Sequence, residues 1–360
     1  MLFRKEILKT WMDPTDRAVF ARVSKACRAA VEAADLPQFQ TFRGHVALPV
    51  KHFVTSAAML RWAREQRCPW EVRTAEAVAK GGCLEALRWA REHGCPWDPS
   101  ALTSAAAGGH LACVMYALYE GCPLDEHYFL KMFIGAARGG HLEILRFFSE
   151  RGFFDDVMSG AVSDPDEIEG WAYVTSQAAE GGHLDVLQWM RERGFPWDES
   201  TCSSAAGEAH FEVLRWARER GAPWGPGTCD AAAWGGHFEL LKWLHDNNCP
   251  WDAMTCAHLA AGGNLQMLRW ARERGCPWDE ETCIYAADNE QLEMLKWVIE
   301  HGCKWNKKKL LRSMRSSTKL AEKNRSEYAN NEEVMLRFSA SIEGLRRVSE
   351  YVQSLDGDGR

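Results

Sequence analysis

The sequence lacks any apolar stretch of the ~18 to 20 residues that a membrane-spanning helix needs. It also lacks a strong charge of one sign, because its formal net charge is -7 over 360 residues. So small a charge implies no general attraction to nucleic acid or to an anionic membrane. Residues 1–11 carry charged side chains instead of the apolar run of a signal peptide. We therefore expect no membrane partner, regard nucleic acid as an unlikely partner, and expect a cytoplasmic and/or nuclear location.

Sequence motifs for catalysis and for metal binding are missing as well. The chain has no phosphate-binding loop, dinucleotide fingerprint, His-Glu-x-x-His or Gly-x-Ser-x-Gly motif. It has no Cys-x-x-Cys pair, which is the usual zinc spacing. Five histidines recur at one position of a repeat, which predicts a structural hydrogen bond rather than convergence on one metal. We expect no enzyme, no cofactor and no metal site.

Ten of the 13 cysteines follow the repeat, which argues against a disulfide framework. One set recurs at Cys68, Cys95, Cys122, Cys249, Cys276 and Cys303, and a second at Cys202, Cys229, Cys256 and Cys283. Equivalent atoms of neighbouring repeats lie about 10 Å apart, the spacing of packed helices. A disulfide needs Cα atoms within about 7 Å. The cysteines are therefore interpreted as small buried side chains.

The dipeptide Pro-Trp is the most regular feature that the chain does contain. It stands at Pro69-Trp70, Pro96-Trp97, Pro196-Trp197, Pro223-Trp224, Pro250-Trp251 and Pro277-Trp278, in steps of 27 residues within each block. A second tryptophan precedes each copy by eight positions, as Trp216 precedes Trp224. A fixed period of this size is typical of a stacked solenoid. We expect these tryptophans to cover the core; an exposed ladder of rings is the alternative.

One repeat read along its length predicts two short helices. Asp198 is suited to cap the first helix, which ends at a glycine-rich turn before His210. The second helix, with apolar residues on one face, ends at Gly221, and Pro223 prevents its continuation. Equivalent caps are predicted at Asp98, Asp125, Asp252 and Asp279. The fold class is therefore all-α, a solenoid of paired helices.

These residues resemble the ankyrin repeat. The resemblance rests on Ala205-Ala206, on the run from His210 through Val213-Leu214 to Gly221-Ala222, and on matching runs at 179–194 and 232–244. It covers about residues 50 to 310 and implies an ankyrin-like helical-repeat solenoid, with short turns in place of the family's β-fingers. In that family the first helices line the concave face.

Side chains that vary between repeats on the first helices are the candidates for recognition. The resemblance to the ankyrin family points to a partner-binding face, and tryptophan and tyrosine are common anchors of interfaces. The predicted partner-binding residues are Glu208, Asp230, Trp234, His258 and Tyr285. Drift at positions that folding does not constrain is the alternative explanation of this variation.

The N-terminal segment differs from the repeats. Residues 6–37 run through Ile7-Leu8, Met12-Asp13-Pro14, Val19-Phe20 and Val23-Ser24, an order similar to the F-box. That family docks onto the small adaptor of cullin-type ubiquitin ligases. The resemblance implies adaptor docking through Leu8, Met12, Pro14, Phe20 and Val23. A helical cap for the repeats is the alternative.

Three regions are expected along the chain. They are an F-box-like helical module at 1–45, an ankyrin-like array at 46–316 with an acidic loop inserted at 155–170, and a basic linker with a C-terminal helix at 317–360. The leading hypothesis is a non-catalytic protein-interaction module, in its most specific form the substrate-recognition subunit of a cullin-type ubiquitin ligase. The alternatives are a structural scaffold with no ligase link and a nucleic-acid-associated protein that uses the basic segment 304–325.

Overall fold

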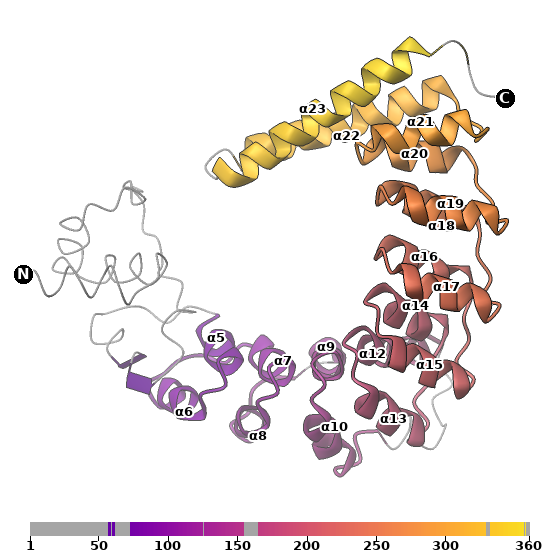
Figure 1. Cartoon of the computed structure of the whole chain (residues 1–360). Helices are drawn as coiled ribbons and strands as arrows, with labels where there is room; N and C mark the ends of the chain where they lie inside the picture. The colour runs from indigo at the N-terminus through magenta and orange to yellow at the C-terminus, as the bar shows by residue number, and fades with distance from the viewer. Residues whose placement is uncertain are drawn as a thin grey trace, which may run out of the picture. The chain divides into compact units, whose positions relative to one another are not determined.

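The fold consists of paired helices. The computed structural model describes residues 57–58, 60–61, 73–124, 126–154, 165–328, 332–355 and 357. Within these ranges every regular element is an α-helix (Figure 1). The predicted all-α class, a helical-repeat solenoid with short turns and no β-fingers, is confirmed for this part of the chain. The helices fall into two units, Met1–Asp164 with Gln188–Gly194 and Pro165–Leu187 with Phe195–Arg360.

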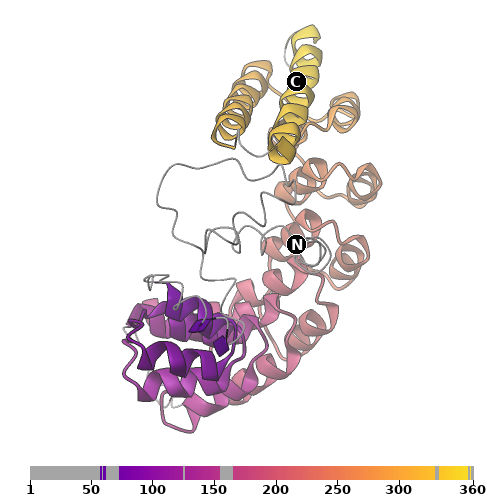
Figure 2. The ribbon, with the colours of Figure 1, turned by 90° about the vertical axis from the view of Figure 1, so that its left-hand side faces the viewer.

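Among its described residues, the first unit contains three helix pairs. They are α5 (Thr74–Lys80) with α6 (Leu84–Glu92), α7 (Ser100–Ala107) with α8 (Leu111–Tyr119), and α9 (Glu126–Arg138) with α10 (Leu142–Ser149). The first helices of the pairs, α5, α7 and α9, pack side by side (Figure 2). Each second helix packs on the first helix of its own pair, so the first helices form the continuous layer.

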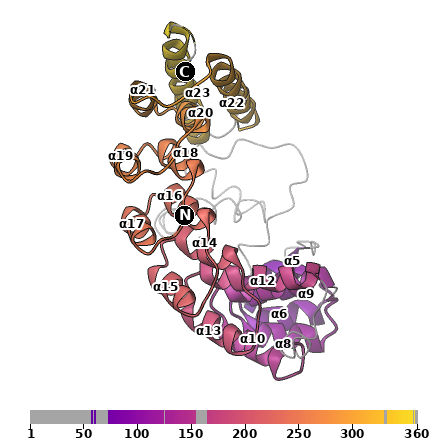
Figure 3. The same cartoon turned by 90° about the vertical axis from the view of Figure 1, so that its right-hand side faces the viewer.

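The second unit repeats this arrangement over a longer stretch. Its elements are α12 (Pro165–Glu180), α14 (Glu199–Gly207), α15 (Phe211–Glu219), α16 (Pro226–Trp234), α17 (Phe238–Asp246), α18 (Ala253–Ala261), α19 (Leu265–Glu273), α20 (Glu280–Asp288), α21 (Leu292–Glu300), α22 (Lys307–Glu327) and α23 (Glu332–Ser354). The residues of α13 (Leu184–Glu192) are divided between the two units. The first helices α14, α16, α18 and α20 follow one another in one row, and the second helices α17, α19 and α21 lie in another (Figure 3).

Local sequence explains where the first helices begin. The Asp198 carboxylate accepts the backbone N–H of Ser200 at 2.9 Å, and Asp252 accepts that of Met254 at 2.8 Å. Asp98 and Asp279 cap α7 and α20 in the same way. Such a cap contributes about 1 kcal/mol because it satisfies an otherwise orphaned N–H. Four of the five predicted caps are confirmed, and Asp125 lies outside the described residues.

The histidine of the turn between the two helices of a pair connects that pair to the preceding one through a hydrogen bond. The His210 imidazole Nε2 lies 2.9 Å from the carbonyl oxygen of Glu180, and the His237 Nε2 lies 2.8 Å from that of Gly207. Gly182, at φ +75°, lets the ring approach so closely that an added Cβ would lie 2.5 Å from it. The predicted hydrogen-bonding role is therefore confirmed for His210 and His237, and Gly182 leaves room for the His210 ring.

Small side chains bring the first helices together. Cys202, Ala205 and Ala206 of α14 are fully buried, as are Cys229 and Ala232 of α16. The second helices add large apolar side chains such as Leu214 and Leu241, each of which contributes on the order of 2 kcal/mol on burial. Because every repeat supplies the same set, the core of the second unit is continuous from α14 to α22.

The C-terminal region departs from the prediction. The expected boundary at 316 falls inside α22, which runs as one helix to Glu327, so the residues expected as a basic linker are helical as far as that point. Asn306 caps this helix by accepting the Lys309 N–H at 2.9 Å. α23 packs along α22 through its buried residues Leu345, Val348 and Val352 (Figure 1).

Two predicted segments fall wholly or partly outside the described residues. The F-box-like segment 6–37, with Leu8, Met12, Pro14, Phe20 and Val23, lies outside them, as do residues 155–164 of the acidic insertion. The rest of that insertion is not a loop, because α12 begins at Pro165 and residues 165–170 form its first turns.

Candidate binding face

Three rings follow one another on consecutive first helices of the second unit. The Trp234 ring of α16 meets the His258 ring of α18 edge to face, with centroids 5.3 Å apart. His258 in turn meets the Tyr285 ring of α20, with centroids 5.6 Å apart. Trp234 is 63% exposed, while His258 and Tyr285 are half-buried. We call Trp234, His258 and Tyr285 the aromatic row.

The repeat explains why these rings meet. His258 and Tyr285 are 27 residues apart and therefore occupy the same position of successive first helices. Trp234 lies one helical turn after the equivalent Ala231, and its longer side chain spans the difference. The predicted members Trp234, His258 and Tyr285 are thus brought together by the structure. Such edge-to-face pairs contribute about 0.5–1.5 kcal/mol beyond their burial.

Asp230 joins two first helices on the same face. Its Oδ1 accepts a hydrogen bond of 2.6 Å from the Thr255 hydroxyl of α18. Burial raises the pKa of the Asp230 carboxyl, an effect that the Thr255 hydrogen bond opposes, and the negative charge of Asp252 adds to the rise. His258 is close enough to lower this pKa in part. Asp230 therefore lies beside the aromatic row in a region of negative potential.

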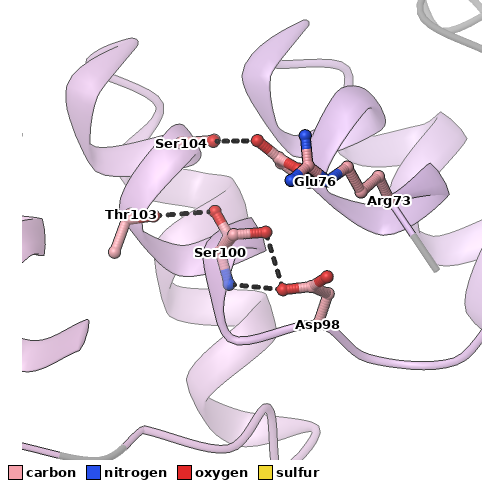
Figure 4. Close-up of polar contacts among 6 residues, drawn as sticks. All are labelled: Arg73, Glu76, Asp98, Ser100, Thr103 and Ser104. Atoms are coloured by element: carbon pink, nitrogen blue, oxygen red, sulfur yellow. Dashed lines mark hydrogen bonds and ion pairs between the residues drawn. The ribbon is translucent and has the colours of Figure 1, made fainter. Parts of the chain in front are cut away.

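In the first unit the equivalent carboxylate also reaches the next first helix, but at a different position, because Ser104 holds the repeat position of His258. Glu76 of α5 holds the repeat position of Asp230, and its Oε1 accepts a 3.5 Å hydrogen bond from Ser104 of α7 (Figure 4). Asp98 caps the same helix α7 through the N–H and hydroxyl of Ser100 (Figure 4). A carboxylate at this position therefore links successive first helices in both units.

Glu208 is the predicted site residue that the structure does not bring to this group. It follows the last residue of α14 and is exposed. No hydrogen bond or ion pair within the described ranges joins it to the other four predicted residues. Its place at the end of a first helix keeps it on the periphery of the candidate face.

Acidic and basic side chains are unequally divided between the first and second helices, a feature that the sequence motifs do not show. In the second unit, α12, α14, α16, α18 and α20 contain no lysine and no arginine. The same helices carry the acidic residues Asp166, Glu167, Glu169, Glu180, Glu199, Asp230, Glu280, Glu281 and Asp288. The second helices hold basic residues that pair with their own acids, as Lys242 does with Glu239 at 2.8 Å. Comparing the composition of the two helices of each repeat would have found this signal.

Besides the core hydroxyls of Thr201, Thr228 and Thr282, two buried polar atoms on these first helices have no hydrogen-bond partner. They are Nδ1 of His258 and Oδ1 of Asp288, whose other oxygen accepts from Ser313 of α22. A buried polar atom without a partner costs about 1–3 kcal/mol. The face therefore offers hydrogen-bonding capacity that the fold itself does not use.

The repeated tryptophans belong to the scaffold. Trp224 of the turn meets Trp243 of α17 edge to face at 5.9 Å, and the Arg218 guanidinium lies 4.3 Å above the Trp224 ring. Trp197 with Trp216, Trp251 with Trp270, and Trp278 with Trp297 repeat the contact. All of these rings are half-buried. Their contacts fit the predicted covering role. Among the described tryptophans, the exposed ring is that of the non-repeating Trp234.

Cysteines of the two sets meet in the core, which the comparison of equivalent positions did not foresee. The Cys229 thiol donates to the carbonyl oxygen of Cys249 at 4.0 Å, and the Cys256 thiol donates to that of Cys276 at 3.9 Å. The Cys283 thiol donates to the carbonyl oxygen of Lys304, the residue after Cys303, at 3.8 Å. All six are free and buried. The hydrogen bond and burial together raise the pKa of Cys229, so the pairs act as apolar filling at neutral pH.

No described helix combines the length and apolar character required to cross a bilayer. Within the described ranges, no group of three or more His, Cys, Asp or Glu side chains is arranged to hold a metal ion.

The fold and this face define an all-α helical-repeat protein of the solenoid class. No protein-family model matches the sequence, and no curated protein does so either. Among solved structures, the chain is similar to the pentatricopeptide repeat protein PPR10 in complex with an 18-nucleotide psaJ RNA element, with a TM-score of 0.29 and 12% identity over 97% of this chain and 57% of that one. For PPR10 from maize the TM-score is 0.27, with 13% identity over 94% of this chain and 54% of that one. The chain spans little more than half the length of these structures, and scores this low assign it neither a ligand nor a binding face.

Proposed function

We propose that this chain is a non-catalytic recognition scaffold that binds a protein partner on the first-helix face of its second unit, built from ankyrin-like repeats. The observation that carries the proposal is the aromatic row on α16, α18 and α20, in which Trp234 is 63% exposed. An exposed tryptophan beside a second aromatic residue is the usual composition of an interface anchor.

Variation across the repeats supports the same reading. Positions that the fold needs, such as Thr255, Cys256 and Ala260, recur in successive first helices as buried residues. The residues at the positions of Trp234 and Tyr285 change from repeat to repeat, and Trp234 is exposed while Tyr285 is half-buried. Binding capacity therefore resides in side chains that can change without cost to the core.

Proximity labelling in cells that express the chain would test the proposal. Proteins labelled by the wild type should be lost with Trp234→Ala and with Tyr285→Ala, while both variants keep the helicity of the wild type. Tyr119→Ala, a change at an exposed tyrosine of the first unit, is the matched control and should keep the partner. A partner retained by both face variants and lost with Tyr119→Ala would contradict the proposal.

A second candidate function is contact with nucleic acid through α22. This helix contains Lys307, Lys308, Lys309, Arg312, Arg315, Lys319, Lys323 and Arg325, and Arg312 and Arg315 are exposed. Basic side chains along one helix are the electrostatic footprint of phosphate binding. Binding of a labelled single-stranded RNA that weakens steeply with salt, and is lost on Arg312→Gln with Arg315→Gln, would support this candidate.

The ligase hypothesis rests on residues 6–37 alone, outside the described part of the chain. Co-purification of a cullin adaptor with the full chain, and its loss with Leu8→Asp, would support it. Retention of the adaptor after deletion of 1–37 would contradict it.

A further inference from the structure

The first-helix face of the second unit carries uncompensated negative charge around an exposed ring. Glu199, Asp230 and Asp288 form no ion pair with lysine or arginine within the described ranges. Glu280 is the acid of this face that meets a lysine, Lys309 of α22. The second helices differ, because Glu212, Glu239 and Glu293 each lie within 3.7 Å of a basic group. Among the helix pairs of the second unit, the negative charge is therefore concentrated on α12, α14, α16, α18 and α20.

The aromatic row adds a second feature that favours a cation. An indole face is the best aromatic acceptor for a lysine or arginine side chain, at about 0.5–1 kcal/mol on an exposed site. The repeats already use this contact on their other side, where Arg218 lies over Trp224 and Arg272 over Trp278. Trp234 has the same chemistry and no cation of this unit over it among the described contacts.

The dimensions of the face indicate an extended ligand. Packed helices lie about 8–10 Å apart, so the row across α16, α18 and α20 covers about 20 Å. An extended chain rises about 3.3 Å per residue, and about six residues match this length. A single small cation would use one ring and leave the rest of the row, with the unpartnered Nδ1 of His258, unoccupied.

We propose that the first-helix face formed by Glu199, Asp230, Trp234, His258, Tyr285 and Asp288 binds an extended peptide segment rich in lysine or arginine. The carboxylates attract the segment, and Trp234 holds one of its cationic side chains against the indole face. Phosphate-bearing ligands are disfavoured here, because these helices offer them no lysine or arginine. This inference rests on the proposed function and names the chemistry of its partner.

Fluorescence anisotropy of the full chain with labelled peptides would test this. The probes are a short peptide of alternating lysine and glycine, a matched peptide of alternating glutamate and glycine, and a single-stranded RNA. We expect the lysine peptide to bind, and Trp234→Ala to weaken it about fivefold, the loss of about 1 kcal/mol of cation–π energy. Asp230→Asn combined with Glu199→Gln should weaken binding and reduce its salt dependence.

The control removes the same charge from the other layer. Glu239→Gln combined with Glu293→Gln alters two exposed acids of α17 and α21 and should leave binding unchanged. Equal losses from both double variants would overturn the inference, because attraction by net charge would then suffice. The inference would also be overturned if the lysine peptide did not bind, or if it bound the wild type and Trp234→Ala equally well.

Two further outcomes separate this inference from the proposed function. If the glutamate peptide or the RNA binds better and is lost with Trp234→Ala, the face is a binding surface but its ligand is not cationic. If the lysine peptide does not bind while labelling of the cellular partner still depends on Trp234, the proposed function is supported and the cationic ligand is contradicted.

Discussion

The Thr255 hydroxyl of α18 donates a 2.6 Å hydrogen bond to the Asp230 carboxylate of α16, which joins two successive first helices beneath the aromatic row. Thr201, Thr228 and Thr282 occupy the same repeat position, and their buried hydroxyls have no partner. The bond therefore depends on Asp230, which the other repeats of this unit replace with other residues.

Thr255→Val should destabilise the protein by about 1–2 kcal/mol, because the half-buried Asp230 carboxylate loses its donor while the shape of the Thr255 side chain is kept. Urea unfolding followed by circular dichroism measures the change. Thr282→Val is the matched control, and it should be neutral or stabilising, since it removes an unsatisfied hydroxyl. Equal effects from the two substitutions would show that the hydrogen bond contributes nothing.

Trp234→Ala should lower the free energy of unfolding by about 0.5–1.5 kcal/mol, the contribution of the edge-to-face contact with His258, because the ring is otherwise largely exposed. Trp243→Ala should cost about 2–4 kcal/mol, since this half-buried ring contacts Trp224 and Phe211. Thermal or urea unfolding of the two variants checks the contrast. A large loss with Trp234→Ala would mean that this ring belongs to the core and not to a binding surface.

His237→Ala should cost about 1–3 kcal/mol, because the Gly207 carbonyl loses its partner and the ring leaves a gap above the Gly-Gly turn. His237→Gln should cost less. Gln291 stands at the equivalent position of a later repeat, and its side chain reaches over Gly263 as the histidines do over their glycines. Urea unfolding of both variants tests this, and a glutamine variant no more stable than the alanine variant would exclude the hydrogen bond as the cause.

Cys202 should resist alkylation in the native protein. Burial raises the pKa of this thiol from 9.0 to about 12, so the thiolate fraction near neutral pH falls about 1000-fold, and the thiolate is the reactive form. Iodoacetamide treatment followed by mass spectrometry of peptides measures the rate. The urea-unfolded chain is the control and should be labelled rapidly at the same cysteine. Equal rates in the two states would show that the core of α14 opens freely.

The helices were predictable because their signals are local and repeated. Asp198 before a helix, a Gly-Gly turn and Pro223 after a helix each act within a few residues, and the repeats show them many times. The continuation of α22 was not predictable in this way. The serines at 316–317 are typical of a linker, but packing of α23 along this stretch favours helix.

The candidate site was predicted in part. Variation between repeats selected Trp234, His258 and Tyr285, and the structure brings their rings into contact. The same rule selected Glu208, which lies apart, because variation marks freedom from the core and not proximity to a ligand. The absence of lysine and arginine from five first helices was visible in the sequence once the helix pairs were delimited.

The sequence by itself determined the class of this protein, its period and the ends of most of its helices. These properties arise from hydrogen bonds, glycine conformations and apolar faces within one repeat, and a short stretch of chain contains them all. Only the tertiary structure decided which side chains of different repeats meet: Thr255 with Asp230, Cys229 with Cys249, and the rings of the aromatic row. Such contacts depend on the offset between packed helices, and no single repeat encodes that offset.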